Sequence, residues 1–366
     1  MIKLATVFSG IGAIEQALKQ MNLEYEIVFA CDNGERYLDI DQEEIIEQIK
    51  GLSEEEKEKK IREIYNSTGK ENNVKKSYFA NYDITEDRWY EDIRFLDGKR
   101  FKGKVDLLVG WSPCQSFSTY GKRGGLDDTR GTLFYDYARL IKEIQPKVFI
   151  FENVTGLLNH DNGKTWKIIQ EVFTSLNYHI KFKVMDSQYY GLPQMRKRVF
   201  VVGINNSIDY KQEFEFPEHV ELTDKASDFL DEEVDDKYYL GEKGFIYVTT
   251  PERNEGRARV NRDIIGCQTA NQQFNWIGDF RVEKPKDSFY KDKRIFIGNY
   301  NGEDAVARKM TPNECLKLMG FKDFKVVVPD TVAYRQSGNS IAVPVLKEIT
   351  KSIMDSINLE NKKEED

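Results

Sequence analysis

The sequence predicts an α/β fold, in which an open, mostly parallel β-sheet carries helices on both faces and is joined to a smaller, irregular domain. Short apolar runs typical of buried strands alternate with amphipathic helical segments from the N-terminus to about residue 207. A glycine-rich turn follows the first apolar run, as in Rossmann-like nucleotide-binding folds. The alternation stops at about residue 208. We therefore predict one domain of residues 1–207 plus 330–366 and a second of residues 208–329.

Composition limits the class of protein. The chain has 366 residues, a net charge of -8 and four scattered cysteines without a CxxC pair. This cysteine pattern predicts neither a disulfide framework nor a metal site and favours a reducing compartment. The chain enters a strand directly, and no apolar run approaches the ~20 residues that a membrane helix needs. We expect a cytoplasmic protein with no membrane part, and a monomer.

The acidic net charge argues at first against a polyanionic partner. However, residues 209–236 alone contain twelve acidic and two basic residues. Four arginines (Arg253, Arg257, Arg259 and Arg262) follow close together. Such a run is usually only a solvated face, so it removes the objection without itself predicting nucleic-acid binding.

The first α/β unit has the form of a nucleotide site. A strand at 3–8 leads into Ser9-Gly10-Ile11-Gly12 and a helix at 13–21, and a second strand at 24–31 ends at Asp32. Glycines let a ligand approach the backbone, and an acidic residue about 20 positions later can accept hydrogen bonds from ribose hydroxyls. No P-loop lysine follows the glycines. These features indicate a nucleoside without a phosphate requirement, or a dinucleotide.

The next stretch contains little chemistry. Residues 41–76 are highly charged and predict two surface helices, the second with a capping box at Ser53 and Glu56. An apolar run at 79–84 predicts a strand that ends in Asp83-Ile84. Asp83 there could contact a purine, or could simply cap the following turn.

Two later strands deliver reactive side chains. The apolar run 105–109 is followed by Pro113-Cys114, and a strand at 148–151 is followed by Glu152. Cys114 could be an inert thiol and Glu152 a helix cap. Because ligands bind at the carboxyl ends of strands in open α/β sheets, both can instead face one crevice. The polar, glycine-rich segment 119–130 would suit a lid over it.

The remaining elements complete the α/β pattern and then leave it. A helix is expected at 165–176 and strands at 179–185 and 198–204. Before the second strand, Arg196 and Arg198 share one side of an extended chain, and could bind a phosphate, a carboxylate or a base carbonyl, or could form salt bridges at a sheet edge. In the second domain we expect strands at 245–249 and 294–297, a helix beginning at Pro312 with Thr311 as its cap, a turn at 336–340 and a final helix at 343–357.

Taken in order, these motifs resemble the DNA cytosine-C5 methyltransferase family. The resemblance covers nearly the whole chain and rests on eight motifs: Phe8-Ser9-Gly10-Ile11-Gly12, Asp32, Asp83-Ile84, Pro113-Cys114-Gln115, Glu152-Asn153-Val154, Gln194-x-Arg196-x-Arg198, Arg308-x-x-Thr311-Pro312-x-Glu314 and Gly338-Asn339-Ser340. The chain departs from the family at Ala13, which is usually glycine, at Trp111, which is often glycine, and at Asn33, where many relatives carry an aromatic residue.

The resemblance implies a Rossmann-like S-adenosylmethionine-dependent methyltransferase and assigns roles to its residues. Cys114 is implied as the thiolate that adds to C6 of cytosine, Glu152 as the acid at N3, and Arg198 as the residue that holds O2, supported by Arg196. No metal is implied. The cofactor S-adenosyl-L-methionine, released as S-adenosyl-L-homocysteine, is expected to contact Phe8, Gly10, Ile11, Gly12, Asp32, Asp83, Ile84, Pro113, Leu133, Asn339 and Ser340.

The implied substrate is double-stranded DNA, from which the target cytosine must be flipped out. Residues 115–130 would close over the base, and residues 208–329 would form the target-recognition domain. The expected DNA contacts are Gln115, Arg123, Arg253, Arg257, Arg259 and Arg262. A bacterial restriction–modification methylase, with a cognate restriction endonuclease as functional partner, is the expected setting. The alternatives are an RNA cytosine-C5 methyltransferase, an inactive DNA-binding paralogue and an NAD-dependent oxidoreductase.

Overall fold

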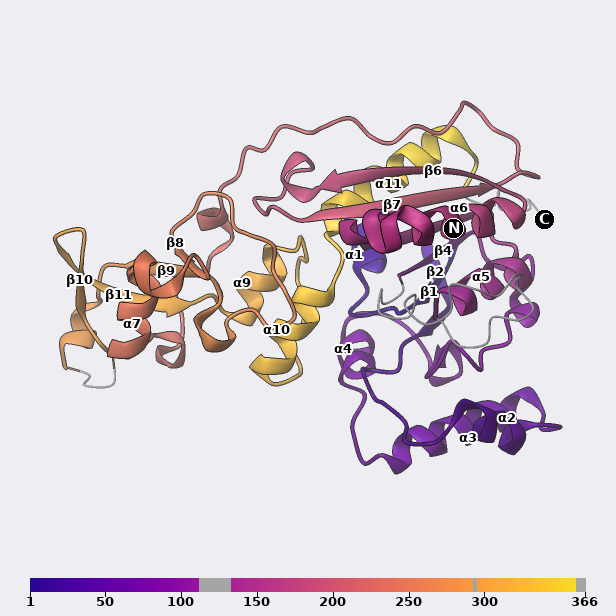
Figure 1. Ribbon diagram of the computed structural model, residues 1–366, viewed down its shortest axis with the longest axis horizontal. Helices are drawn as coiled ribbons and strands as arrows, with labels where there is room; N and C mark the ends of the chain where they lie inside the picture. The colour runs from indigo at the N-terminus through magenta and orange to yellow at the C-terminus, as the bar shows by residue number, and fades with distance from the viewer. Residues whose placement is uncertain (112–132, 292–294, 360–366) are drawn as a thin grey trace. The chain divides into compact units, whose positions relative to one another are not determined.

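The computed structural model describes residues 1–111, 133–291 and 295–359, and the chain divides into two compact units (Figure 1). The first unit contains Met1–Met185, Lys197–Glu218 and Leu346–Asp366, and the second contains Asp186–Arg196 and His219–Val345. The second unit thus includes the loop 186–196 and residues 330–345, which were predicted to belong to the first domain, and the first unit includes residues 208–218. The functional assignment of the two predicted domains stays a prediction.

A seven-stranded sheet forms the centre of the first unit, in the order β3-β2-β1-β4-β5-β7-β6. Strands β1 to β5 pair in parallel, whereas β7 runs antiparallel to β5. The carboxyl ends of the parallel strands therefore share one edge with the start of β7. The strands are β1 (Ile2–Val7), β2 (Tyr25–Cys31), β3 (Trp89–Tyr90), β4 (Leu107–Trp111), β5 (Val148–Val154), β6 (Tyr178–Asp186) and β7 (Lys197–Asn205).

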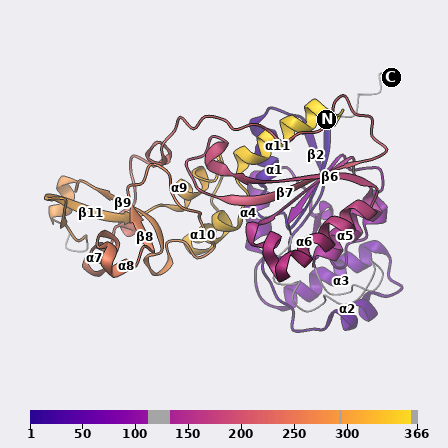
Figure 2. The ribbon, with the colours of Figure 1, turned by 45° about the horizontal axis from the view of Figure 1, so that its top comes forward.

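Helices lie on both faces of this sheet, as predicted. On one face α5 (Leu133–Ile144) and α6 (Lys164–Ser175) bury an aromatic core against the strands, in which Phe134, Tyr137 and Phe173 meet Phe149 and Phe151. Figure 2 shows α1 (Ala13–Gln20) and α11 (Val343–Ser356) on the other face. The apolar runs and helical spacings of the sequence thus give the expected layers.

Residues 41–84 differ from the prediction. They form three helices: α2 (Gln42–Ile49), α3 (Glu54–Ser67), whose capping box is present as expected, and α4 (Asn73–Asn81). The predicted strand at 79–84 was wrong. Asn72 caps α4 through its side chain, and the aromatic residues Tyr78 and Phe79 pack on Trp89 rather than joining the sheet.

The second unit is built on a smaller sheet in the order β10-β11-β9-β8. One apolar cluster packs helix α7 against this sheet, and a second lies around α9 and α10. The elements are α7 (Glu242–Thr249), α8 (Pro251–Asn254), β8 (Ala258–Val260), β9 (Gly278–Glu283), β10 (Gly298–Tyr300), β11 (Glu303–Lys309), α9 (Pro312–Lys317) and α10 (Asp330–Asn339).

Three predictions for this unit were wrong. One is the strand at 294–297, because residues 295–297 are not in a strand and β10 begins at Gly298. Residues 245–249 are helical, because Phe245 and Val248, three positions apart, both face the apolar cluster. Residues 336–339 form the last turn of α10 rather than a free turn. The start of α9 was predicted correctly, with Thr311 as the cap and Pro312 at the first position. No helix within the described ranges is long and apolar enough to cross a membrane.

Candidate active site

The glycine turn after β1 is held in a costly conformation. Phe8 has a φ of 51°, and Gly10 and Gly12 also have positive φ values. A non-glycine residue in this region costs about 1–3 kcal/mol, so its surroundings must impose it. Ser9 contributes to this, because its backbone N–H donates to the Cys31 carbonyl and its Oγ accepts from the Cys31 N–H. Among the described residues, a Cβ at Gly10 would meet nothing closer than 3.9 Å, so these residues leave the approach to this turn open.

Asp32 lies beside this turn at the end of β2. Its carboxylate oxygens accept hydrogen bonds from the backbone N–H groups of Gly10, at 2.9 Å, and Gly34, at 2.8 Å. Burial raises the pKa of Asp32 to about 6, although these two hydrogen bonds oppose the shift. Asn33, at the position that is aromatic in many relatives, forms a turn in which its Oδ1 accepts from the Glu35 N–H. The turn and Asp32 together form an acceptor site suited to ribose hydroxyls.

The predicted pair Asp83 and Ile84 does not follow a strand, whereas a second Asp-Ile pair does. Asp83 is exposed and Ile84 is half-buried, and both lie in the turn after α4 rather than at a strand end. Asp92 and Ile93 instead follow β3, whose Tyr90 carbonyl accepts a hydrogen bond from the Asp32 N–H. The signal was available, since the sequence contains a second Asp-Ile pair, closer to Cys114.

Glu152 and Arg198 meet at the same edge of the sheet. The Arg198 Nε lies 3.1 Å from the Glu152 Oε1, and both side chains are largely buried. Glu152 is in register with Trp111 on β4 and with Phe200 on β7. The sheet itself therefore positions the carboxyl group and orients it with a guanidinium.

Trp111, at the end of β4, contacts the glycine turn after β1 and is paired with Glu152 on β5. Its indole Nε1 donates a hydrogen bond to the Phe8 carbonyl at 3.0 Å, and the two rings lie 5.8 Å apart. The preceding residue must be glycine, because a Cβ at Gly110 would come within 2.6 Å of the Val7 side chain. Trp111 thus contributes to holding Phe8 in its strained conformation.

The two arginines of the predicted pair have different partners. Arg196 is buried in the second unit, where its guanidinium donates to the carbonyls of Gln268 (2.8 Å), Gly338 (3.0 Å) and Ser340 (2.6 Å). Its interactions hold the end of α10, which includes Asn339. A Cβ at Gly338 would lie 2.1 Å from the Thr269 carbonyl oxygen, so this close approach requires glycine. Arg196 therefore supports the backbone of this segment.

Several predicted residues lie outside the described residues, in 112–132: Pro113, Cys114, Gln115 and Arg123. The predicted lid, 115–130, lies there as well. Leu133, a predicted cofactor contact, is the first residue of α5 and packs against the aromatic core.

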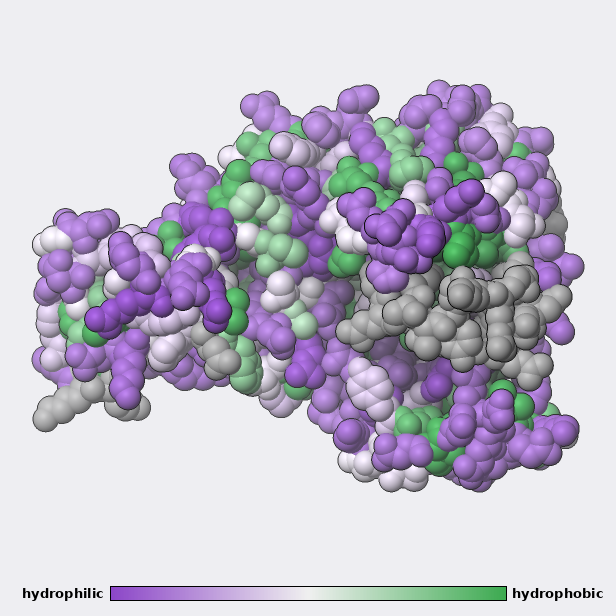
Figure 3. Space-filling model, viewed as in Figure 1, coloured by the Kyte–Doolittle hydropathy of each residue, from purple (hydrophilic) through white to green (hydrophobic). Residues whose placement is uncertain are grey.

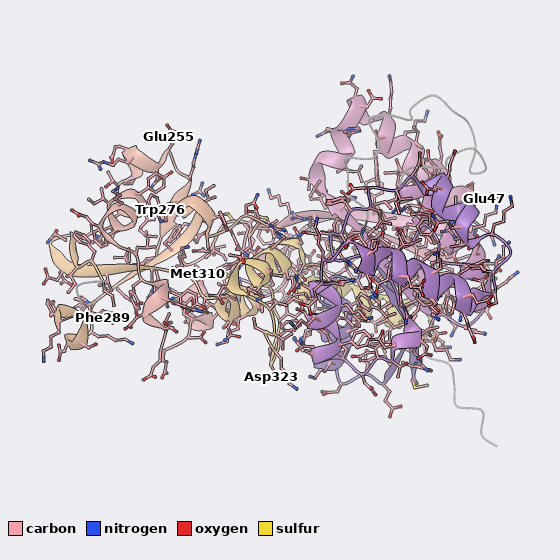
Figure 4. The ribbon with its side chains drawn as sticks, turned by 90° about the horizontal axis from the view of Figure 1, so that it is seen from below. Glu47, Glu255, Trp276, Phe289, Met310 and Asp323 are labelled. Atoms are coloured by element: carbon pink, nitrogen blue, oxygen red, sulfur yellow. The ribbon has the colours of Figure 1, made fainter. Side chains whose placement is uncertain are left out.

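The four basic residues of the second unit are not equivalent. Arg253, Arg257 and Arg259 are exposed, and Arg257 lies 3.8 Å from Glu255, which Figure 4 labels. Arg262 instead forms two hydrogen bonds with the Asp279 carboxylate, at 2.7 and 2.9 Å. The Arg262 guanidinium is therefore paired within this unit, and its contact with DNA stays a prediction.

Comparison with known proteins identifies the family of this chain. Residues 44–355 match the family model described as C-5 cytosine-specific DNA methylase. The Type II methyltransferase M.SsoII of Shigella sonnei is 35% identical over 292 residues, which are 78% of this chain and 72% of that protein. The Type II methyltransferase M.HpaII of Haemophilus parainfluenzae is 35% identical over 305 residues, covering 78% of this chain and 81% of that protein.

Solved structures show the same fold. A mutant of Spodoptera frugiperda DNMT2 superposes with a TM-score of 0.67 at 20% identity, covering 97% of this chain and all of that chain. The S. pombe Dnmt2 methyltransferase superposes with a TM-score of 0.64 at 16% identity, covering 97% of this chain and 99% of that chain.

Proposed function

Because the chain belongs to the family of C-5 cytosine-specific DNA methylases, we propose that it transfers a methyl group from S-adenosylmethionine to C5 of a cytosine flipped out of a specific DNA duplex site. The observation that carries this proposal is the edge of the first sheet. There Glu152, near the carboxyl end of β5, and Arg198, at the start of β7, pair at the same edge of the sheet as the Asp32 site, with β4 between β5 and β1.

The residues at the glycine turn fit the cofactor. Gly10 leaves its approach open, the Asp32 carboxylate can accept hydrogen bonds from ribose hydroxyls, and Phe8 offers an aromatic surface. S-adenosylmethionine supplies an electrophilic methyl group when bound. We assign Asp92 and Ile93, rather than Asp83 and Ile84, to the purine end of the pocket, because they follow the strand next to Asp32. Asn339 and Ser340 stay predicted contacts.

The chemistry requires a nucleophile because cytosine C5 does not attack a methyl group unaided. The Cys114 thiolate adds to C6, and the displaced electron pair passes to N3, where Glu152 donates a proton. The resulting enamine attacks the methyl group through C5. Loss of the C5 proton then restores the double bond and expels Cys114. Arg198 pairs with Glu152, which supports its proposed role in orienting Glu152 and holding the O2 carbonyl of the base.

A trapping experiment tests this mechanism. A duplex with 5-fluorocytosine at the target position cannot lose a proton from C5, so the enzyme should stay covalently attached to DNA after denaturation. The adduct should form with wild-type protein and cofactor, and Cys114→Ser should not form it. A wild-type protein that methylates DNA without forming this adduct contradicts the mechanism.

Two further assays define the substrate. Equal amounts of duplex DNA and tRNA offered with labelled cofactor should give label in DNA alone; label in tRNA instead would favour the RNA alternative. Bisulfite sequencing of a plasmid expressed with the protein would identify the target site. Resistance of that plasmid to endonucleases that cut at this site would support a restriction–modification role, as the names of the relatives suggest.

A further inference from the structure

The helical segment, residues 41–82 with α2, α3 and α4, resembles a solvated surface addition when it is viewed from outside. Figure 3 shows mainly hydrophilic residues over α2 and α3, at the lower right. Inside, the segment has a small apolar core of its own, formed by Ile45, Ile49, Ile61, Ile64 and Tyr65. Two of its other buried side chains, Asn72 and Tyr82, reach the loops that we assign to the cofactor.

Tyr82, which ends α4, holds the glycine turn. Its hydroxyl lies 3.0 Å from the Ile11 carbonyl oxygen and 2.7 Å from that of Gly12. The side chain is buried, and a Cβ at Gly12 would come within 2.2 Å of its ring. Because peptide groups are planar, fixing these carbonyls fixes the two peptide planes at the start of α1.

Asn72, which caps α4, holds Asp32. Its Nδ2 donates to the Asp32 carbonyl at 2.9 Å and to Glu91 at 3.0 Å, while its Oδ1 accepts from the Lys75 N–H. Glu91 in turn forms a buried ion pair with Arg36. One side chain therefore begins the helix and fixes the backbone that carries the ribose acceptor.

Tyr65 of α3 makes a third contact, with the side chain of Asp92. Its hydroxyl lies 2.5 Å from the Asp92 Oδ2, which also accepts from Arg94 at 2.6 Å. The three strand ends β1, β2 and β3 are thus each bonded to the helical segment. The bonded residues Gly12, Asp32 and Asp92 lie beyond the ends of these strands, so the pairing of the strands does not hold them.

We propose that the helical segment sets cofactor affinity and that Asn72 and Tyr82 are positioning residues, which keep Asp32 and the glycine turn in their binding-competent conformation. This inference rests on the proposed function. A loop that is binding-competent for only part of the time lowers apparent affinity by that fraction. One net hydrogen bond, at about 1 kcal/mol, corresponds to about a fivefold change.

Two conservative variants test the inference. Tyr82→Phe removes only the hydroxyl, and Asn72→Ser keeps a good helix cap but is too short to reach the Asp32 carbonyl. Each should raise the dissociation constant of S-adenosylhomocysteine, measured by calorimetry, about fivefold. Each should also raise the KM for S-adenosylmethionine by a similar factor and leave kcat within about twofold, since neither side chain touches the reacting atoms.

Two matched controls separate positioning from general stability. Tyr178→Phe removes another buried tyrosine hydroxyl, which donates to the Pro146 carbonyl at 2.7 Å far from these loops. Ser53→Ala removes the cap of α3 within the same segment. Both should lower the melting temperature and leave the dissociation constant unchanged.

The outcomes distinguish this inference from the proposed function. If wild-type protein does not bind S-adenosylhomocysteine, the proposed function is wrong. If the wild type binds but Tyr82→Phe and Asn72→Ser bind equally well, only the inference is overturned. An equally large rise in the dissociation constant of Tyr178→Phe or Ser53→Ala would also overturn the inference.

Discussion

The site residues of this protein are held in two different ways. Glu152 and Arg198 lie on neighbouring strands, so repeated backbone hydrogen bonds set their positions. Asp32 and Arg196 are held instead by side-chain hydrogen bonds between segments far apart in sequence. We therefore expect that substitution of a strand-held residue lowers activity but hardly changes the stability of the fold. A residue held by side chains couples function to stability or to ligand affinity.

The largest expected effect is on the strand-held acid. Glu152→Gln keeps the shape and an acceptor for Arg198 but cannot donate an acidic proton, so kcat should fall about 10²–10⁴-fold. Single-turnover methyl transfer measures this effect. The melting temperature and the cofactor dissociation constant should hardly change. A kcat within tenfold of wild type would remove Glu152 from the mechanism.

Arg196 should behave in the opposite way. Arg196→Met leaves three carbonyls without their charged donor, which should lower the free energy of unfolding by about 2–4 kcal/mol. Urea titration followed by circular dichroism measures the loss. If Arg196→Met is as stable as wild type, the side-chain hydrogen bonds of Arg196 do not stabilise the fold, and Arg196 does not differ from the strand-held residues in this respect.

Asp32 should make cofactor binding depend on pH. Its pKa of about 6 means that the carboxylate is mostly ionised at pH 7.5 and mostly protonated at pH 5. Ribose hydroxyls donate to the ionised form, so affinity should weaken by roughly tenfold as the pH falls across this range. Calorimetry with S-adenosylhomocysteine would show it. Asp32→Asn should bind weakly with no such dependence, and an equal slope in that variant would exclude Asp32 as the cause.

The smallest effect separates two arginines of the second unit. Arg259→Gln should reduce the salt dependence of duplex binding by about one counterion, because Arg259 is exposed. Arg262→Gln should leave that slope unchanged, because Asp279 already occupies its guanidinium. Fluorescence anisotropy at several salt concentrations tests both variants, and equal slopes for the two would show that the ion pair opens on DNA.

The sequence indicated the strand-held residues and also Asp32 and Arg196, but it did not indicate the partners that hold Asp32 and Arg196 in place. The apolar run before Glu152 has the length and composition of a buried strand, and β5 has that form. Asp92 was missed because the strand before it, β3, has only two residues. The run around Phe79 was predicted as a strand instead, because its composition is strand-like although it lies mostly in a helix. The apolar, β-branched composition of residues 245–249 likewise led to a predicted strand, where the structure has helix α7.

The long-range partners could not be found by any local pattern. Asn72 lies 40 positions from Asp32, and Arg262 lies 17 positions from Asp279. Only folding brings such pairs together, and each depends on the reach of one side chain. The sequence predicted residues 41–76 to be surface helices without chemistry, and this describes their outer face. The contacts of their inner face could not be predicted, because they depend on segments far away in the sequence.

The bond from the Trp111 indole to the Phe8 carbonyl has an evolutionary consequence. Relatives with glycine at this position have no indole to donate there, so their turn must be supported by other means. Because the two rings also lie 5.8 Å apart, substitutions at positions 8 and 111 should covary across the family, with tryptophan retained where the aromatic residue of the turn is retained. A tally of paired substitutions among homologous chains would show whether these two positions have diverged together.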